Sequence, residues 1–101
     1  MSARRAAIPR RLRRALRDLV CFCPTDRPVQ VEMMRHSRLW GDCDRDGGRF
    51  VVRIAWAGPW TMVDALAHEW AHALTWGRGR PHGRGWAVAY SRCRRIAMKE
   101  D

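Results

Sequence analysis

Acidic residues and lysine are scarce in this sequence. It has 20 basic residues against 10 acidic ones, a net charge of +10, and Lys99 is its one lysine. No stretch of 18 or more apolar residues occurs, which argues against a membrane-spanning helix. The N-terminal segment also lacks the continuous apolar region of a secretory signal. We therefore expect a cytoplasmic protein whose four cysteines are reduced thiols.

The chain is short, with 101 residues, of which 47% are hydrophobic. This length suits one small domain and is too short for two, because each domain needs its own core. The apolar content favours a folded chain over a disordered one. We expect a single domain that spans residues 1–101, in which residues 1–7 are disordered.

Most of the positive charge lies near the N-terminus, where residues 1–20 contain seven arginines and one acidic residue, Asp18. Apolar side chains from Ile8 to Leu19 recur at helical spacing, which predicts an amphipathic helix. Its basic face suits a polyanion such as DNA, an acidic protein or an anionic lipid surface. A solvated helix face is the alternative interpretation. The candidate nucleic-acid-binding residues are Arg10, Arg13, Arg14 and Arg17.

A small sheet is predicted for the middle of the chain. Apolar and polar residues alternate over 29–34, which indicates a half-buried strand. A second strand is expected at 38–43, and the glycine-containing segment 44–48 has the composition of a turn. The β-branched and aromatic run at 50–56 predicts the strongest strand. We expect about three antiparallel strands.

Two helices are predicted to follow the sheet. Thr61 and Asp64 have the spacing of a capping box, so the first of these helices should follow Thr61, with Thr61 as its N-cap. This helix should end near Trp76, where Gly77 follows. After a basic, glycine-rich loop, the residues from 86 to 97 have the apolar spacing of a last helix. The chain is therefore expected to adopt an α+β fold. Its elements should follow in the order N-terminal helix, small sheet, central helix and C-terminal helix.

The central predicted helix contains the sequence His-Glu-Trp-Ala-His, an HExxH motif at residues 68–72. Residues four apart lie on one face of a helix, so His68 and His72 can bind one zinc ion. Glu69 projects beside the metal, where its carboxylate can accept a proton from water. Two surface histidines without a metal are the alternative interpretation.

A catalytic zinc site needs a third protein ligand and an open position for water. His82 follows His72 by ten residues, and Gly77, Gly79 and Pro81 allow the chain to reverse toward the helix. The last predicted helix contains no Asp or Glu that could serve instead. We therefore expect His82 to complete a site for one zinc ion per chain, the alternative being a loop histidine in solvent.

The HExxH motif and the segment 81–86, Pro-His-Gly-Arg-Gly-Trp, resemble the SprT-like zinc metallopeptidases. The upstream order of a helix, a small sheet and the HExxH helix is also similar. The likeness extends over roughly residues 8–98, and its specific part is residues 66–86. It implies a minimal zincin-like domain with three zinc ligands (His68, His72 and His82), a general base and acid (Glu69) and a packing residue behind the site (Trp86).

Substrate binding by such a peptidase would involve further residues. The strand at 49–55 can pair with an extended substrate if it lies at the sheet edge beside the cleft. Tyr90 and Arg84 are candidates for stabilising an oxyanion, although packing is the favoured interpretation of Tyr90.

The cysteines and tryptophans have alternative roles. Cys21, Cys23, Cys43 and Cys93 could form a structural zinc site or a disulfide, but the Cys-x-Cys spacing is shorter than zinc sites favour, so we expect free thiols. Most of the six tryptophans are expected to build the core, with stacking on nucleic-acid bases as the alternative.

The sequence thus predicts a zinc-dependent metallopeptidase that acts on a protein or peptide substrate. SprT-like relatives include proteases that digest proteins crosslinked to DNA, so the resemblance also implies DNA-associated substrates and DNA binding through the basic N-terminal helix. The alternatives are a zinc-stabilised nucleic-acid-binding module and an inactive regulatory pseudo-peptidase.

Overall fold

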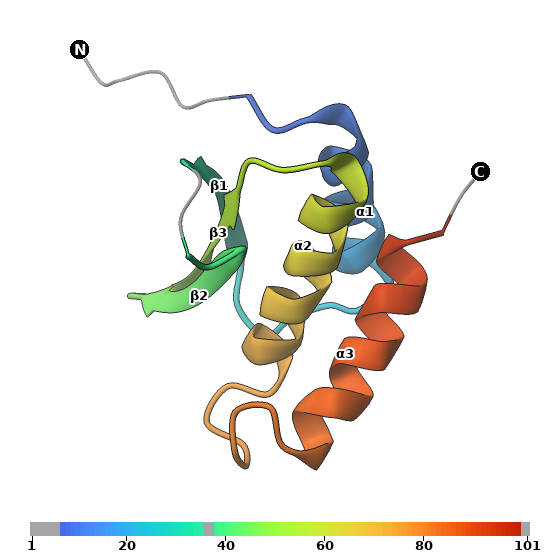
Figure 1. Ribbon diagram of the computed structural model, residues 1–101. Coiled ribbons are helices and arrows are strands. Elements are labelled where there is room, and N and C mark those ends of the chain that lie inside the picture. Colours follow the sequence, from blue (N-terminus) through green and yellow to red (C-terminus); the bar gives the residue numbers. More distant parts are fainter. Residues whose placement is uncertain (1–6, 36–37, 100–101) are drawn as a thin grey trace.

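The computed structural model describes residues 7–35 and 38–99 (Figure 1). The expected disorder of residues 1–7 therefore lies outside the described residues, except at Ala7. Three helices and three strands follow in the order α1 (Arg10–Phe22), β1 (Val29–Met34), β2 (Gly41–Asp46), β3 (Arg49–Ala55), α2 (Pro59–Leu74) and α3 (Arg84–Ala97). The predicted α+β fold, with its helix, sheet, helix, helix order, is confirmed. Within the described residues, no helix has the length and apolar character needed to span a bilayer.

The sheet is mixed, so the prediction of an antiparallel sheet is wrong for one pair of strands. Its order is β1-β3-β2, with β2 antiparallel and β1 parallel to β3. A tight turn with Gly47 at φ 63° joins β2 to β3 as a hairpin. β3 is the most buried strand, so it takes the central place, and β1 pairs with its remaining edge. The strand expected at the sheet edge is therefore the middle one, and β2 is an edge strand instead.

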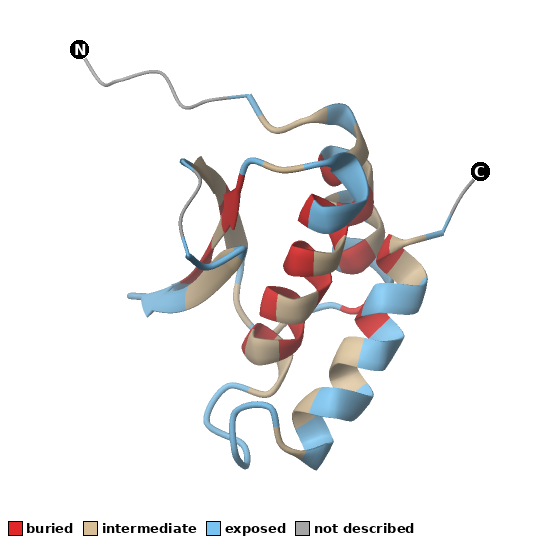
Figure 2. Ribbon diagram, in the orientation of Figure 1, coloured by how far each residue is buried: buried red, intermediate tan, exposed pale blue. Residues whose placement is uncertain are grey.

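Helix α2 lies at the centre of the fold, between the sheet on one side and α1 and α3 on the other (Figure 1). A helix covered on both sides is expected to be apolar over most of its circumference. Nine of its residues are buried, including Glu69 (Figure 2). Helices α1 and α3 each present a narrower buried stripe, formed by Leu12, Ala15 and Leu19 in α1 and by Cys93 and Ala97 in α3.

Only Trp70 among the tryptophans is fully buried, so the prediction that most tryptophans build the core is wrong. Trp70 is 1% exposed, and its indole Nε1 donates a hydrogen bond to the carbonyl of Cys23 at 2.8 Å. The other indoles lie at the ends of elements or in loops, where the layers leave them partly open to solvent. Those that are exposed are Trp40, Trp56, Trp60 and Trp76.

The start of α2 also differs from the prediction. The helix begins at Pro59, with Gly58 as its N-cap and no side-chain capping bond, so Thr61 already lies within the first turn. Proline is suited to this position because a first-turn residue needs no N–H partner. Asp64 contacts helix α3 through Tyr90 and Arg94 and is not part of a capping box.

Candidate metal centre

The side chains of three histidines converge at the C-terminal half of α2. His68 and His72 lie one helical turn apart, and His82 comes from the loop that follows the helix. The Nε2 atom of His82 lies 3.0 Å from the Nε2 atoms of both other rings. The three ligand atoms all fall within 4.8 Å of one another. The structure thus brings together the three residues that the sequence suggests as ligands.

The loop between α2 and α3 needs an unusual backbone to return His82 to the helix. Gly77 and Gly79 have φ angles of 72° and 70°, which glycine adopts at little cost. His82 has φ 61°, a conformation that is uncommon for a residue with a side chain. The next residue, Gly83, leaves no room for a Cβ atom, which would lie 2.9 Å from the carbonyl oxygen of Arg80. Such strain is concentrated at functional sites in proteins.

The indole of Trp86, on α3, packs against all three imidazoles. Its ring centroid lies 4.6 Å from that of His82, 4.7 Å from that of His68 and 5.3 Å from that of His72. Its Nε1 donates a hydrogen bond to the carbonyl of His68 at 3.3 Å, and its ring also stacks on that of Tyr90. Trp86 therefore limits the positions that the three rings can adopt.

The donor set fits a divalent cation. Burial lowers the pKa of His72 to about 4, with the neighbouring histidines contributing, and burial also lowers the pKa of His68. Neutral rings that carry their protons on Nδ1 direct three Nε2 lone pairs to one point. Three imidazole ligands with one open position are typical of catalytic zinc sites. Within the described residues, these histidines could hold a metal ion.

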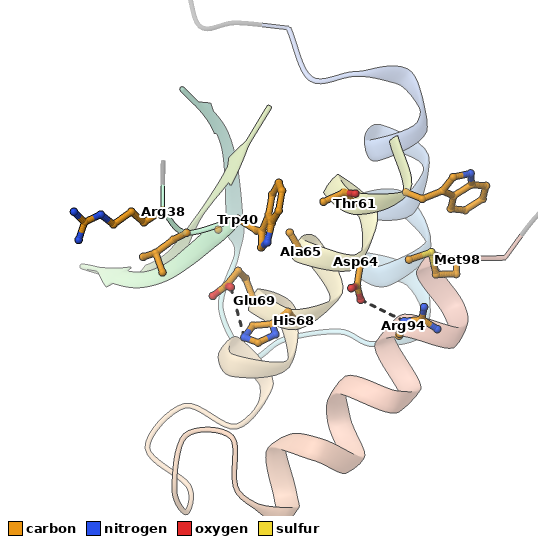
Figure 3. A pocket seen from close by; sticks show the side chains of 12 residues that line it. Arg38, Trp40, Thr61, Asp64, Ala65, His68, Glu69, Arg94 and Met98 are labelled. Carbon is orange, nitrogen blue, oxygen red and sulfur yellow. Dashed lines mark ion pairs between the residues drawn. The ribbon is translucent and has the colours of Figure 1, made fainter. Parts of the chain in front are cut away.

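Glu69 lies beside the three histidines and is almost completely buried, with 7% of its surface exposed. Its Oε2 atom is 3.9 Å from Nε2 of His68 (Figure 3). Burial raises the pKa of Glu69 to about 7, and the negative charge of Asp42 adds to the shift. Strand β2 packs directly on this side chain, because a Cβ atom at Gly41 would lie 3.3 Å from its Cγ.

An open cleft runs past these residues. It consists of two cavities of about 520 and 450 Å³ that share Leu39, Gly41, His68 and Glu69. Figure 3 shows the first cavity, where Trp40 stands on the sheet side and Arg94 and Met98 on the α3 side of α2. The second cavity extends along β2 to the loop that carries His82. The candidate metal centre is therefore accessible from both directions.

The other candidate residues lie elsewhere. The four arginines of α1 line a separate cavity of about 460 Å³ and are absent from the lining of the cleft. The hydroxyl of Tyr90 donates a hydrogen bond to Asp64, and the exposed Arg84 begins α3 without lining the cleft.

The prediction of free thiols agrees with the structure, in which none of the four cysteines forms a disulfide. No metal-competent group among the described residues includes a cysteine.

Sequence reasoning missed several residues that shape the cleft. Gly41 allows β2 to approach Glu69. Leu39 and Trp40, which precede Gly41 in the chain, line the first cavity. Asp64 and Arg94 form an ion pair beside His68, with Nε to Oδ1 at 3.3 Å. The sequence suggested only a capping role for Asp64, and the other residues belong to no local motif. Their positions in the cleft depend on how β2 and α3 pack on α2.

Comparison of the chain with family models, curated proteins and solved structures finds no match.

Proposed function

We propose that this protein is a zinc-dependent metallopeptidase of the SprT-like, zincin-like kind, and that it hydrolyses peptide bonds in the cytoplasm. In this proposal His68, His72 and His82 hold one zinc ion. The observation that carries it is the buried carboxylate of Glu69 beside three converging imidazoles in an open cleft. A structural zinc site is closed by four protein ligands and has no need of such a carboxylate.

When bound, zinc supplies Lewis acidity, which polarises a carbonyl group and makes a neighbouring water molecule more acidic. Glu69 accepts a proton from the attacking water and passes it to the leaving amine. The packing of Gly41 against Glu69 holds the carboxylate in place. An extended substrate pairs with the main chain of the edge strand β2, which runs alongside Glu69.

The test combines metal analysis with a peptidase assay on unfolded casein. Wild-type protein should bind one zinc ion per chain and cleave the substrate, and a chelator should abolish cleavage. Glu69→Gln should retain the zinc and lose at least about 100-fold in rate, since general acid–base catalysis contributes about 10²–10⁴-fold. Glu32→Gln, on the sheet, is the matched control and should cleave normally.

The outcomes separate the alternatives. Full activity of Glu69→Gln would remove this residue from the mechanism. One zinc ion per chain without cleavage of any substrate would instead favour a zinc-stabilised binding module or an inactive pseudo-peptidase. Absence of zinc binding would contradict both the peptidase and the zinc-stabilised binding module, and would leave the inactive pseudo-peptidase.

A second candidate function is binding of DNA by helix α1, with proteins attached to that DNA as substrates. The cavity on α1 is lined by four arginines alone, Arg10, Arg13, Arg14 and Arg17. The apolar face of the same helix is buried in the core, so it is not available to a membrane surface. Regularly spaced guanidinium groups suit the phosphates of a nucleic acid.

Fluorescence anisotropy with a labelled DNA duplex tests this second function. The affinity should fall steeply as salt increases. Arg10→Gln and Arg13→Gln together should weaken binding and reduce the slope of log Kd against log salt by about 2. Arg95→Gln, on α3, should change the slope by less than half of that. A slope that stays the same in the double variant would contradict a role for α1.

A further inference from the structure

Two acidic side chains line the cleft besides Glu69, and each of them pairs with an arginine of the protein. Asp42 forms an ion pair with Arg53, with 3.1 Å between Oδ1 and Nη1. Asp64 pairs with Arg94 and also accepts the hydrogen bond from Tyr90. A neighbouring arginine therefore offsets part of the negative charge of each of these two carboxylates.

Three arginines in the cleft have the opposite property. Arg38 lines the first cavity, with its guanidinium group directed outward at the rim (Figure 3), and Arg78 and Arg80 line the second, so positive charge lies toward both ends of the cleft. All three are exposed, and in the part of the chain that is described none has an acidic partner within 4.0 Å. The cleft as a whole therefore has a positive potential that its own carboxylates do not cancel.

We propose that the cleft binds acidic polypeptide segments, with Asp or Glu side chains on both sides of the bond to be cleaved. Arg78 and Arg80 bind the carboxylates on the loop side, and Arg38 binds those on the other side. Guanidinium groups bind carboxylates through paired hydrogen bonds. The ligand is a polypeptide because strand β2 presents a main-chain edge along the cleft. This inference rests on the proposed function for the cleavage step, and its binding step is testable separately.

Binding is measured with the zinc-loaded Glu69→Gln variant, so that no substrate is consumed. Three fluorescent peptides share one apolar centre and differ in their flanks, which are Asp and Glu, Asn and Gln, or Lys. The acidic peptide should bind at least about 10-fold more tightly than the amide peptide at low salt, and the difference should shrink as salt rises. Equal affinity of the acidic and amide peptides would overturn the proposal.

Charge reversal identifies the surface. Arg78→Glu, Arg80→Glu and Arg38→Glu should each reduce the preference for the acidic peptide by about threefold or more, which is the range of a single exposed ion pair. Arg95→Glu changes the charge equally on α3, away from the cleft, and should leave the preference unchanged. Equal losses in all four variants would indicate net charge alone and would contradict a built site. A single-stranded oligonucleotide that displaces the acidic peptide with greater affinity, through the same three arginines, would also overturn the proposal.

The wild-type protein then links binding to cleavage. We expect kcat/KM to follow the same order of peptides, with the difference in KM. If no peptide is cleaved, the metallopeptidase proposal fails, whereas the affinities of the acidic and amide peptides still decide whether the cleft recognises acidic segments.

Discussion

The candidate metal centre joins two unlike regions, the buried helix α2 and the exposed loop at residues 75–83. On α2, His68 and His72 are held by a backbone whose neighbouring side chains are mostly buried. His82 lies in a loop of exposed residues, and its own backbone has positive φ. Two ligands are therefore positioned by core packing, and the third by the local geometry of the loop. A change in the core should affect stability first, and a change in the loop should affect metal binding first.

The largest expected effect is on the helix side. Trp70→Ala should lower the free energy of unfolding by about 3–5 kcal/mol, the cost of removing a large buried aromatic side chain. It also removes the hydrogen bond to the carbonyl of Cys23. Urea unfolding of the metal-free protein measures this, with the exposed Trp56→Ala as control, which should cost less than about 1 kcal/mol. Similar costs for both variants would contradict the burial of Trp70.

On the loop side, His82→Asn should separate metal binding from stability. Asparagine tolerates positive φ, so the metal-free protein should keep its free energy of unfolding within about 1 kcal/mol. Loss of a residue that only supports a ligand costs up to about 100-fold in metal affinity. Loss of the ligand His82 itself should lower the zinc affinity by more than that. Calorimetric titration with zinc and urea unfolding test the two parts. Unchanged zinc affinity would exclude His82 as a ligand.

A smaller effect is expected for Gly83→Ala. The added Cβ would lie 2.9 Å from the carbonyl oxygen of Arg80, so the turn must open and His82 must move. Zinc affinity should fall about 10-fold, which corresponds to about 1.4 kcal/mol. Gly85→Ala is the matched control, because a Cβ there has no neighbour within 4 Å, and its zinc affinity should be normal. Equal affinities in the two variants would show that the turn does not position the ligand.

The smallest effect on activity is expected for Tyr90→Phe. Tyr90 lies on α3 and contacts α2 through Asp64. Loss of the hydrogen bond to Asp64 should cost about 1 kcal/mol of stability. The hydroxyl is held by Asp64, so we expect kcat/KM to stay within about threefold of wild type. A fall in kcat of about 100-fold or more, with zinc retained, would instead identify Tyr90 as an oxyanion donor.

Local patterns predicted the elements better than their arrangement. The α1 helix and all three strands were expected near their observed positions, because periodicity and turn residues are local signals. The second strand was expected at 38–43 and runs over Gly41–Asp46. Its composition is polar, since only one face of this edge strand is covered, so its limits carry little apolar signal. The parallel pairing of β1 with β3 had no local signal at all.

The spacing in the chain was sufficient to place His68 and His72 on one face of a helix and Glu69 next to them, because helical geometry depends on near neighbours alone. The degree of burial of Glu69, the contact with Gly41 and the basic cleft required segments distant in the sequence to pack together. Hydrophobic burial is non-directional, so the apolar pattern of the sequence indicates which residues form the core. It does not indicate which strand lies beside the histidines, and only the tertiary packing decides that.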